Sequence, residues 1–505
     1  MEKISTQGMR FVDEYGRERI FRGINLIDKK PHLGKKVIFK YPVDDAYLQR
    51  CQSLGFNLIR LGALWDVFEP QPGQYNEEFL DELGEILDRC AKYGIYVFLD
   101  VHQDVWGEAA NKGGSGAPAW ATLTDGYKVK NTRFVWSEGY FFRKAVWAAF
   151  DNFWGNAPVQ GKGLQDWYAD LWRHLAARFK DKPALLGYEP MNEPFSGRLG
   201  GKTFRRLIAS LVKVVLTDKR VKIGKLLHDA RKNPNHVLDQ INGDVLLDIA
   251  AVCAPLTRDF DENRYNPFLN KITSAIREID PGHTVFVGDS YWSNIGIPCF
   301  GGPIAPGGAR ESNQCFTPHA YDFTVDTPAY EFANNDRVGG IFAEHRRAQE
   351  RINAPVIVGE WGGGGEGTNW YPHISSLLDL FEKNKWSNTY FFYLEDAEEM
   401  AYRNKVEVGK QDLFEIPLAS EVLSRPFPMA VGGEIERYHY DETGRTFELV
   451  FTQSEVCSAP TEVFLPSAPK EVQVSGGEHE VEPYGGGFCI KWQTVPGVHS
   501  LNVRI

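Results

Sequence analysis

The stretch of sequence from residue 57 to residue 101 decides the fold class. It begins with the apolar run Asn57-Leu-Ile-Arg-Leu61 and ends with the apolar run Ile95-Tyr-Val-Phe-Leu-Asp-Val101. Between the two runs, residues 79–93 carry apolar side chains at helical spacing, and Gly94 ends this predicted helix. Two buried strands joined by an amphipathic helix form a βαβ unit, in which the strands run parallel.

The same alternation of apolar runs and helical patterns continues on both sides of this unit, from residue 9 to about residue 395. Further strands are predicted at 20–26, 184–188, 284–287, 356–358 and 388–393, and further helices at 45–54, 164–179 and 268–279. Repeated strand–helix units with wholly apolar strands favour an α/β fold that closes as a (β/α)8 barrel. An open doubly wound sheet is the structural competitor, although neither GxGxxG nor GK[ST] follows an early strand.

The pattern changes after Ser424. Residues 425–505 read as short alternating strands separated by turn signals, which is typical of a small antiparallel β-sandwich. The predicted domains are therefore a barrel over 1–424 and a sandwich over 425–505. The sandwich either supports the barrel or binds sugar, and the first role is the simpler interpretation.

Composition narrows the class of protein. The 505 residues hold 56 Lys and Arg against 67 Asp and Glu, a formal charge of −11, which argues against a general nucleic-acid-binding protein. No signal segment or long apolar run is visible, so we expect a cytoplasmic protein, or a secreted one if a leader has been removed. Seven widely spaced cysteines without a CxxC pair predict neither a disulfide framework nor a structural zinc site.

Two glutamates stand out at predicted strand ends. Glu193 lies in Gly187-Tyr-Glu-Pro-Met-Asn-Glu-Pro194, and Glu360 lies in Val356-Ile-Val-Gly-Glu-Trp361. The C-terminal ends of barrel strands form one face, so we expect the two carboxyl groups to meet there. Two facing carboxyl groups are what glycosidic cleavage needs, because one holds a proton for the leaving oxygen while the other stays ionised near the anomeric carbon.

Further polar residues follow predicted strands in the same order along the chain. Each alone has a structural interpretation, since a lone arginine is often an internal ion-pair partner and a lone histidine is more often packed than catalytic. Their combination at successive strand ends is what indicates a site. The residues are Arg60, His102, Asp104, Asn192, His319 and Tyr321.

Together these motifs resemble glycoside hydrolase family 5. The resemblance to the family rests on Leu54-Gly-Phe-Asn-Leu-Ile-Arg60, Asp100-Val-His102, Asn192-Glu-Pro194, His319-Ala-Tyr321 and Gly359-Glu-Trp361. Other segments are similar to its endoglycoceramidase and glucosylceramidase-like branch, and the resemblance covers essentially the whole chain. These segments are Arg22-Gly-Ile-Asn25 with Lys29, Leu99-Asp-Val-His-Gln-Asp104, Gly116-Ala-Pro-Ala-Trp120, Phe150-Asp-Asn-Phe-Trp154 and Arg425-Pro-Phe-Pro428.

The resemblance implies a retaining β-glycosidase without a metal or organic cofactor. Glu360 would attack the anomeric carbon, and Glu193 would protonate the departing oxygen and then activate the water that releases the sugar. Asn192 would hold the sugar 2-hydroxyl group. Arg60 and Tyr321 would keep Glu360 ionised.

The remaining implied roles concern sugar binding. His102 and His319 would orient carboxylates and hydroxyl groups, and Lys29, Asp104 and Trp120 resemble sugar-binding positions of the branch. Family members usually present a tryptophan at the end of the eighth strand. Here that run reads Tyr390-Phe-Phe-Tyr-Leu-Glu-Asp396, so Phe392 or Tyr393 would have to supply the wall.

The implied substrate is a sugar linked to a lipid, such as glucosylceramide or a related glycosphingolipid. An alternative within the family is a β-glucosidase or endoglucanase acting on a steryl glucoside, another β-glucoside or a β-glucan. A different class is a non-catalytic sugar- or lipid-binding protein on an enzyme scaffold, which the intact pair of Glu193 and Glu360 disfavours.

A long basic insertion follows the acid motif, at about 197–266. Its first part, 198–227, holds nine Lys and Arg against one Asp, a net charge of +8, and apolar residues at helical spacing. One interpretation is a helix packed on the acidic barrel with its charges solvated. The other is a lid that makes transient contact with an anionic membrane surface and guides a lipid-linked sugar into the cleft.

Overall fold

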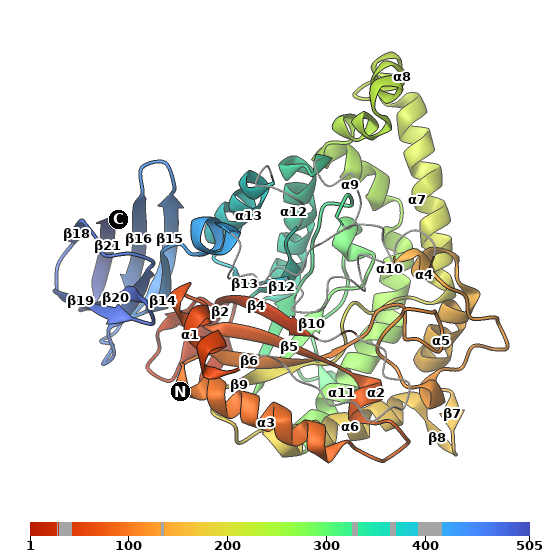
Figure 1. The fold of residues 1–505 in the computed structure, drawn as a ribbon, viewed down its shortest axis with the longest axis horizontal. Helices are drawn as coiled ribbons and strands as arrows, with labels where there is room; N and C mark the ends of the chain where they lie inside the picture. Colours follow the sequence, from red (N-terminus) through yellow and green to blue (C-terminus); the bar gives the residue numbers. More distant parts are fainter. Residues whose placement is uncertain (28, 30–42, 133–135, 326–331, 364–369, 392–416) are drawn as a thin grey trace.

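A computed structural model describes all residues of the chain except 28, 30–42, 133–135, 326–331, 364–369 and 392–416. Eight parallel strands follow one another in the order β11-β10-β9-β6-β5-β4-β13-β12, with helices outside them (Figure 1). Isolated parallel bridges between Phe316 and Val356 and between His319 and Glu360 join the two outermost strands. The predicted (β/α)8 barrel is confirmed.

Every residue of these eight strands is buried, because side chains fill the barrel interior on one face and pack against helices on the other. Seven strands correspond to predicted apolar runs, and the sequence had not predicted β11 as a strand. The bounds are β4 (Arg22–Ile27), β5 (Leu58–Leu64), β6 (Tyr96–His102), β9 (Leu185–Glu189), β10 (Thr284–Gly288), β11 (Gln314–Thr317), β12 (Ile357–Trp361) and β13 (Ser387–Tyr390).

The outer helix α3 (Glu77–Lys92) illustrates why these segments become helices. The side chain of Asn76 accepts a hydrogen bond from the Phe79 backbone N–H at its start, and acidic residues occupy its first turn. Its apolar residues recur every three or four positions and are buried against the barrel. The other helices around the barrel are α1 (Asp45–Ser53), α2 (Trp65–Phe68), α4 (Glu138–Phe142), α5 (Lys144–Trp154), α6 (Leu164–Phe179), α11 (Asn266–Arg277), α12 (Asn335–Ile352) and α13 (Tyr371–Asn384), and a short β7 (Pro158–Val159)–β8 (Lys162–Gly163) hairpin precedes α6.

The C-terminal segment forms two antiparallel sheets, ordered β15-β16-β21-β18 and β1-β2-β3-β14-β17-β20-β19. The second sheet includes three strands from the start of the chain, β1 (Ile4–Gln7), β2 (Arg10–Asp13) and β3 (Glu18–Arg19), and Arg19 in β3 pairs with Ala430 in β14. The C-terminal strands are β14 (Phe427–Val431), β15 (Glu434–Asp441), β16 (Thr446–Gln453), β17 (Thr461–Leu465), β18 (Glu471–Val474), β19 (Glu478–Tyr484), β20 (Gly487–Gln493) and β21 (Gly497–Arg504).

A buried carboxylate joins this C-terminal part to the barrel. Glu382 in α13 accepts hydrogen bonds from Arg22 Nη2 in β4 at 2.9 Å and from Arg425 Nη1 at 3.4 Å. The Tyr440 backbone N–H and the His439 ring, both in β15, lie 3.0 and 3.2 Å from its other oxygen. The Glu382 side chain therefore links the barrel strand β4 and helix α13 to strand β15 of the C-terminal sheets.

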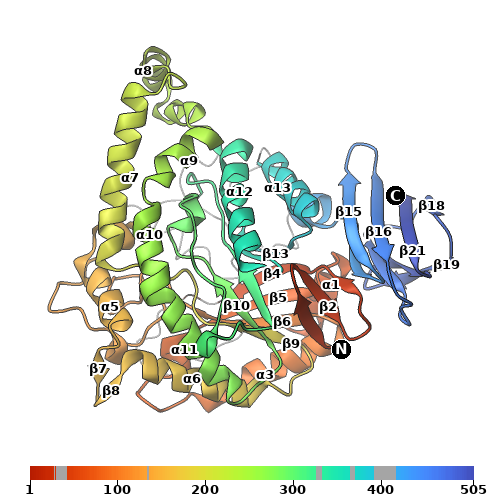
Figure 2. The ribbon, with the colours of Figure 1, turned by 180° about the vertical axis from the view of Figure 1, so that it is seen from behind.

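The insertion contains four α-helices, α7 (Arg198–Thr217), α8 (Ile223–Lys232), α9 (Gly243–Ala251) and α10 (Ala254–Phe260). A 3-10 helix, η2 (Pro234–Gln240), lies between α8 and α9, and a π-helical turn, η3 (Asp261–Tyr265), follows α10. In both views α7 extends away from the barrel, and α8 lies at its far end (Figures 1 and 2). Within the described part of the chain, none of the helices combines the length and apolar character needed to cross a membrane.

Candidate active site

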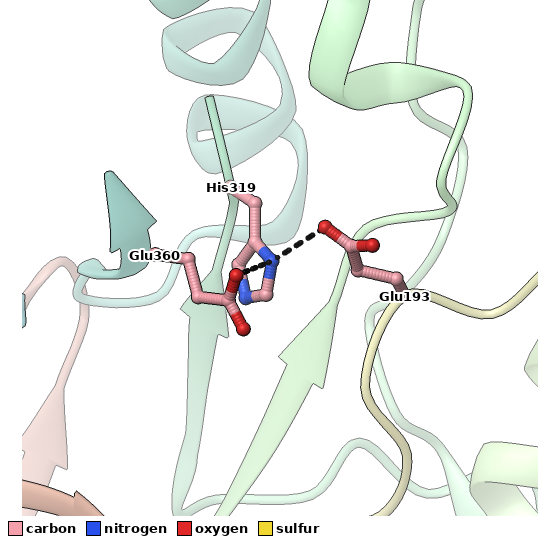
Figure 3. Close-up of side chains that lie close together, drawn as sticks. All are labelled: Glu193, His319 and Glu360. Carbon is pink, nitrogen blue, oxygen red and sulfur yellow. Dashed lines mark hydrogen bonds and ion pairs between the residues drawn. The ribbon is translucent and has the colours of Figure 1, made fainter. Parts of the chain in front are cut away.

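Glu193, His319 and Glu360 meet at the C-terminal ends of β9, β11 and β12 (Figure 3). The Nδ1 atom of His319 lies 3.0 Å from Oε1 of Glu193 and 3.7 Å from Oε2 of Glu360. One side-chain atom of each of the three residues lies within 4.8 Å of the others, and all three side chains are buried. The two glutamates that the sequence singled out thus face each other across a histidine.

The backbone around Glu193 is held in an unusual conformation. Glu193 has a φ of +40°, which is rare for a residue with a side chain and is kept only when neighbouring contacts enforce it. The Gln103 side chain supplies such contacts, because its Nε2 donates to the backbone oxygens of Asn192 at 3.1 Å and of Glu193 at 3.0 Å. Gln103 Oε1 in turn accepts from the Trp106 backbone N–H and the Tyr140 hydroxyl.

Arg60 connects the parts of the site. The sequence placed it at a strand end, but it lies in the middle of β5, paired with Asn25 and Phe98, and its long side chain spans the remaining distance. Its Nη1 donates to Glu360 at 2.7 Å and its Nη2 to Asn192 Oδ1 at 2.9 Å. Its Nε donates to Glu189 at 2.6 Å and its Nη2 lies 3.0 Å from Asp100, so this buried cation contacts three carboxylates.

The environment of Glu360 favours its ionised form. Burial raises the pKa of a carboxyl group, but the positive charges of His319 and Arg60 outweigh burial and hold the pKa of Glu360 well below its usual range. The Tyr321 hydroxyl donates to Glu360 Oε2 at 3.2 Å. Glu360 therefore stays an anion at neutral pH.

His319 sits between the two carboxylates. Burial lowers the pKa of an imidazole, yet the charge of Glu360 and the hydrogen bond to Glu193 raise the pKa of His319 to about 9. An imidazolium cannot ligate a metal ion, because both ring nitrogens carry protons. The set of Glu193, His319 and Glu360 has the donor atoms for a divalent cation, but the charges of Arg60 and His319 make it a poor cation site.

A second chain of charges lies beside Arg60. His102 Nδ1 is 2.7 Å from Asp100, and its Nε2 is 3.6 Å from Asp104, which pairs with Lys29 Nζ at 2.9 Å. Burial works against ionisation of Asp104, but Lys29 and the bond to His102 lower the pKa of this carboxyl far below its usual range. The amide Nδ2 of Asn192 lies 3.4 Å from His102 Nε2, which joins the two groups.

Trp120, a sugar-binding candidate that the structure describes, packs with other aromatic rings. The Trp120 ring packs edge-on against Trp65 and Trp167 at 5.4 and 5.9 Å, and its Nε1 donates to the Glu69 backbone oxygen. Trp120 therefore belongs to an aromatic group between the barrel and α6. Phe392 and Tyr393 lie outside the described residues.

The structure adds five residues that the sequence had not singled out. Three are charged or amide side chains on barrel strands, where a polar residue inside an apolar run was the available signal. These three and Gln103 all lie within motifs quoted above, where no role was given to them, and Asn294, on the loop after β10, had no local signal. The five are Asn25, Asp100, Gln103, Glu189 and Asn294.

Comparison with known proteins gives two family matches. Residues 12–396 match the family model described as cellulase (glycosyl hydrolase family 5), and residues 425–505 match the glycoside hydrolase family 5 C-terminal domain. An endoglycoceramidase of Cyanea nozakii is 26% identical over 493 residues, covering 90% of this chain and 82% of that protein.

Two further proteins are similar to this chain, one over less than half of its length and one over nearly all of it. An ergosteryl-beta-glucosidase of Saccharomyces cerevisiae is 30% identical over 295 residues, covering 44% of this chain and 37% of that protein. Among solved structures, endo-glycoceramidase II from Rhodococcus sp. in complex with ganglioside GM3 has a TM-score of 0.70 at 23% identity, covering 99% of each chain. The structural likeness concerns the fold, including the C-terminal sheets.

Proposed function

The chain belongs to glycoside hydrolase family 5, and from this membership we propose that it is a retaining β-glycosidase that separates a sugar from a lipid aglycone. The observation that carries the mechanism is the spacing of Glu193 and Glu360, whose nearest carboxylate oxygens lie within 4.8 Å. Inverting enzymes keep their carboxyl groups roughly 6.5–9.5 Å apart to hold a water molecule, whereas retaining enzymes keep them about 5–5.5 Å apart. Single oxygens of the two groups that approach within 4.8 Å leave little room for such a water molecule, which favours double displacement.

In the first step Glu360 is the nucleophile. One of its ionised oxygens bonds to the anomeric carbon while the bond from that carbon to the aglycone oxygen breaks. Arg60 and Tyr321 hold the carboxylate in place. Glu193 gives its proton to the departing oxygen, so the aglycone leaves as an alcohol.

In the second step Glu193 takes a proton from water, which attacks the anomeric carbon and releases Glu360. The Oδ1 of Asn192 accepts from Arg60, and one N–H of its Nδ2 donates to the Gln103 backbone oxygen at 3.1 Å. The other N–H, on the side of His102 Nε2 at 3.4 Å, is the one that would serve the sugar 2-hydroxyl group. Lys29 and Asp104 offer a paired donor and acceptor for hydroxyl groups of the same sugar.

Aromatic rings leading away from Glu193 support a lipid aglycone. The Tyr291 backbone N–H donates to the oxygen of Pro194, next to the acid, and its ring lies 6.1 Å from Phe141. Phe141 stacks on Phe204 in α7 at 4.9 Å, and Phe142, whose side chain is 60% exposed, contacts Phe204 at 5.3 Å. An apolar track of this kind suits a hydrocarbon chain better than a glucan, which needs polar subsites along its length.

The outward face of α7 continues this track and supports contact with an anionic membrane surface. Ile208, Val212 and Leu216 recur every four residues and are 42, 52 and 65% exposed. Exposed Arg205, Arg206 and Lys213 flank them, within a segment of net charge +8. Exposed apolar residues beside basic ones are typical of a helix that lies on a lipid surface.

The alternative, that α7 is simply a helix packed on the rest of the protein, explains its inner face. Gly200, Gly201, Thr203 and Ser210 are buried, and Leu207 and Leu211 pack partly against the core. A helix that only packs on the barrel has no need of three large apolar side chains on its exposed face. Both faces are used if α7 packs one side on α4, α5 and α9 and presents its other side to lipid.

Mass spectrometry of the products from glucosylceramide and lactosylceramide tests the substrate class, with Glu360→Gln as the inactive control. Free lactose from lactosylceramide indicates an open cleft, and glucose from glucosylceramide alone indicates a closed pocket. Ergosteryl glucoside is included because of the yeast relative. Cleavage of a β-glucan with none of these glycolipids hydrolysed would contradict a lipid aglycone.

The retaining mechanism has its own test. A 2-deoxy-2-fluoro glycoside with a good leaving group traps the glycosyl-enzyme ester, because fluorine slows its hydrolysis. We expect the peptide containing Glu360 to gain the mass of the fluorosugar, and Glu360→Gln to remain unlabelled. Label on any other residue would overturn the assigned nucleophile.

A further inference from the structure

Glu193 has a second hydrogen-bond donor that the family resemblance did not indicate. Asn294 lies in the short helical turn η4 (Ser293–Ile295) after β10, and its Nδ2 is 2.6 Å from Oε1 of Glu193. His319 Nδ1 is 3.0 Å from the same oxygen. Asn294 is 7% exposed, so this contact is shielded from solvent.

The amide of Asn294 serves this contact and no other within the described part of the molecule. Its Oδ1 is buried and accepts no hydrogen bond from a described residue. The turn itself is held by backbone bonds from Ser293 N–H to Ser290 at 2.7 Å and from Gly296 N–H to Ser293 at 2.9 Å. The turn therefore does not require this side chain, whereas rotating the amide would set oxygen against the carboxylate.

The position of both donors has a chemical consequence for the acid. Two N–H groups occupy the lone pairs of Glu193 Oε1, so a proton on that oxygen would lose one of these bonds. The proton of the acid form is therefore placed on Oε2. A carboxyl group whose donating oxygen is fixed can be aimed at one point in the cleft.

We infer that Asn294 is a positioning residue for glycosidic cleavage, which with His319 holds Oε1 of Glu193 so that the proton on Oε2 is delivered to the leaving oxygen. This inference rests on the proposed function. In the step, the Oε2–H bond breaks as the proton passes to the aglycone oxygen. That oxygen keeps the electron pair of its broken bond to the anomeric carbon, and Glu360 supplies the pair for the new bond.

A series of leaving groups provides the test. General acid catalysis contributes roughly 10²–10⁴-fold to departure of a basic leaving group and little to an acidic phenol. Asn294→Leu and Asn294→Ala are measured on aryl β-glucosides and β-lactosides, from 2,4-dinitrophenyl to 4-methylphenyl. We expect kcat/KM to fall on the order of 10- to 100-fold for the poorest leaving group and less than about threefold for 2,4-dinitrophenyl.

Two controls define the result. Ser293→Ala alters the same turn without touching Glu193 and should leave the whole series unchanged. Glu193→Ala lacks the acid altogether and shows how strongly kcat/KM depends on the leaving group when no proton is delivered. A uniform loss across the series in the Asn294 variants, or no loss at all, would overturn the inference while leaving the proposed function intact. A Glu193→Ala series without leaving-group dependence would overturn both.

Discussion

The guanidinium of Arg60 and the carboxylate of Glu360 form an ion pair of 2.7 Å, although two other strands, β4 and β13, separate their strands in the sheet. Both side chains are almost fully buried, at 1 and 6% exposed. Arg60 reaches Glu360 across the barrel while also contacting Glu189 and Asn192. One cation therefore fixes Glu360 and Asn192, the residue next to Glu193, in a common frame.

Replacing Arg60 with lysine tests this geometry. Lysine keeps the charge but has no planar fork to donate to Glu189, Asn192 and Glu360 together. We expect Arg60→Lys to fold with a free energy of unfolding a few kcal/mol below wild type, as on the order of 3 kcal/mol follows from disrupting a buried ion pair. We expect kcat/KM to fall on the order of 100-fold. Urea unfolding and aryl glycoside hydrolysis measure the two effects, and wild-type activity in a folded variant would contradict the role.

The raised pKa of His319 predicts how stability changes with pH. Burial lowers its pKa, but Glu360 and Glu193 raise the folded pKa to about 9 against an ordinary 6.5, with Arg60 opposing them. Stabilisation by the imidazolium is fully present below pH 6.5 and is lost as the pH rises through 9. Over this window the free energy of unfolding of wild type should fall by up to about 3 kcal/mol more than that of His319→Asn. Urea unfolding at several pH values measures this, and parallel profiles would refute it.

The outward face of α7 can be tested with vesicles. Neutralising Arg205, Arg206 and Lys213 together should weaken binding to phosphatidylserine-containing vesicles roughly 100-fold at low salt, since each basic residue contributes about 1 kcal/mol at such a surface. Hydrolysis of water-soluble aryl glycosides should not change.

The matched control removes the same charge from exposed lysines outside α7, by replacing Lys3, Lys92 and Lys383 with glutamine. This variant should bind vesicles almost as wild type does. Equal weakening by both triple variants would indicate a general charge effect, and equal loss of both activities would count against membrane contact through α7.

The buried carboxylate of Glu382 predicts strong coupling between the barrel and the C-terminal sheets. Glu382→Ala leaves the buried guanidinium groups of Arg22 and Arg425 without their shared partner, and we expect a loss of about 3–5 kcal/mol in the free energy of unfolding. Asp379→Asn removes a half-exposed partner of the same Arg425 and should cost about 1 kcal/mol or less. If the two substitutions lowered the free energy of unfolding by similar amounts, the buried ion pairs of Glu382 would contribute no more to stability than the half-exposed pair of Asp379.

Much of the barrel could be predicted because its strands are uninterrupted apolar runs between turn residues. β11 escaped prediction because Gln314-Cys-Phe-Thr317 is short and begins with a polar side chain. In the structure Gln314 Oε1 accepts from the Ile304 backbone N–H, and its Nε2 donates to the Glu311 backbone oxygen. These satisfy its amide inside the protein, and they depend on a loop whose position the local pattern does not encode.

The residues of the candidate site also divide into those that the sequence predicts and those that only the fold reveals. Glu193 and Glu360 could be found because each follows an apolar strand in a motif with a chemical meaning. Asn294 could not, since only the path of the loop after β10 brings its amide to Glu193. Trp120 came from resemblance alone, and in the structure its ring packs against Trp65 and Trp167.

The pairing of β3 with β14 has a consequence for how the chain is made. Arg19 donates to the backbone oxygen of Met429 at 2.9 Å, so strands that leave the ribosome before the barrel complete a sheet whose other members are synthesised after the barrel. Until then β3 has an open edge, which invites pairing with other chains. A nascent chain that stops before residue 427 would expose that edge permanently, so premature termination should yield insoluble fragments rather than a free barrel.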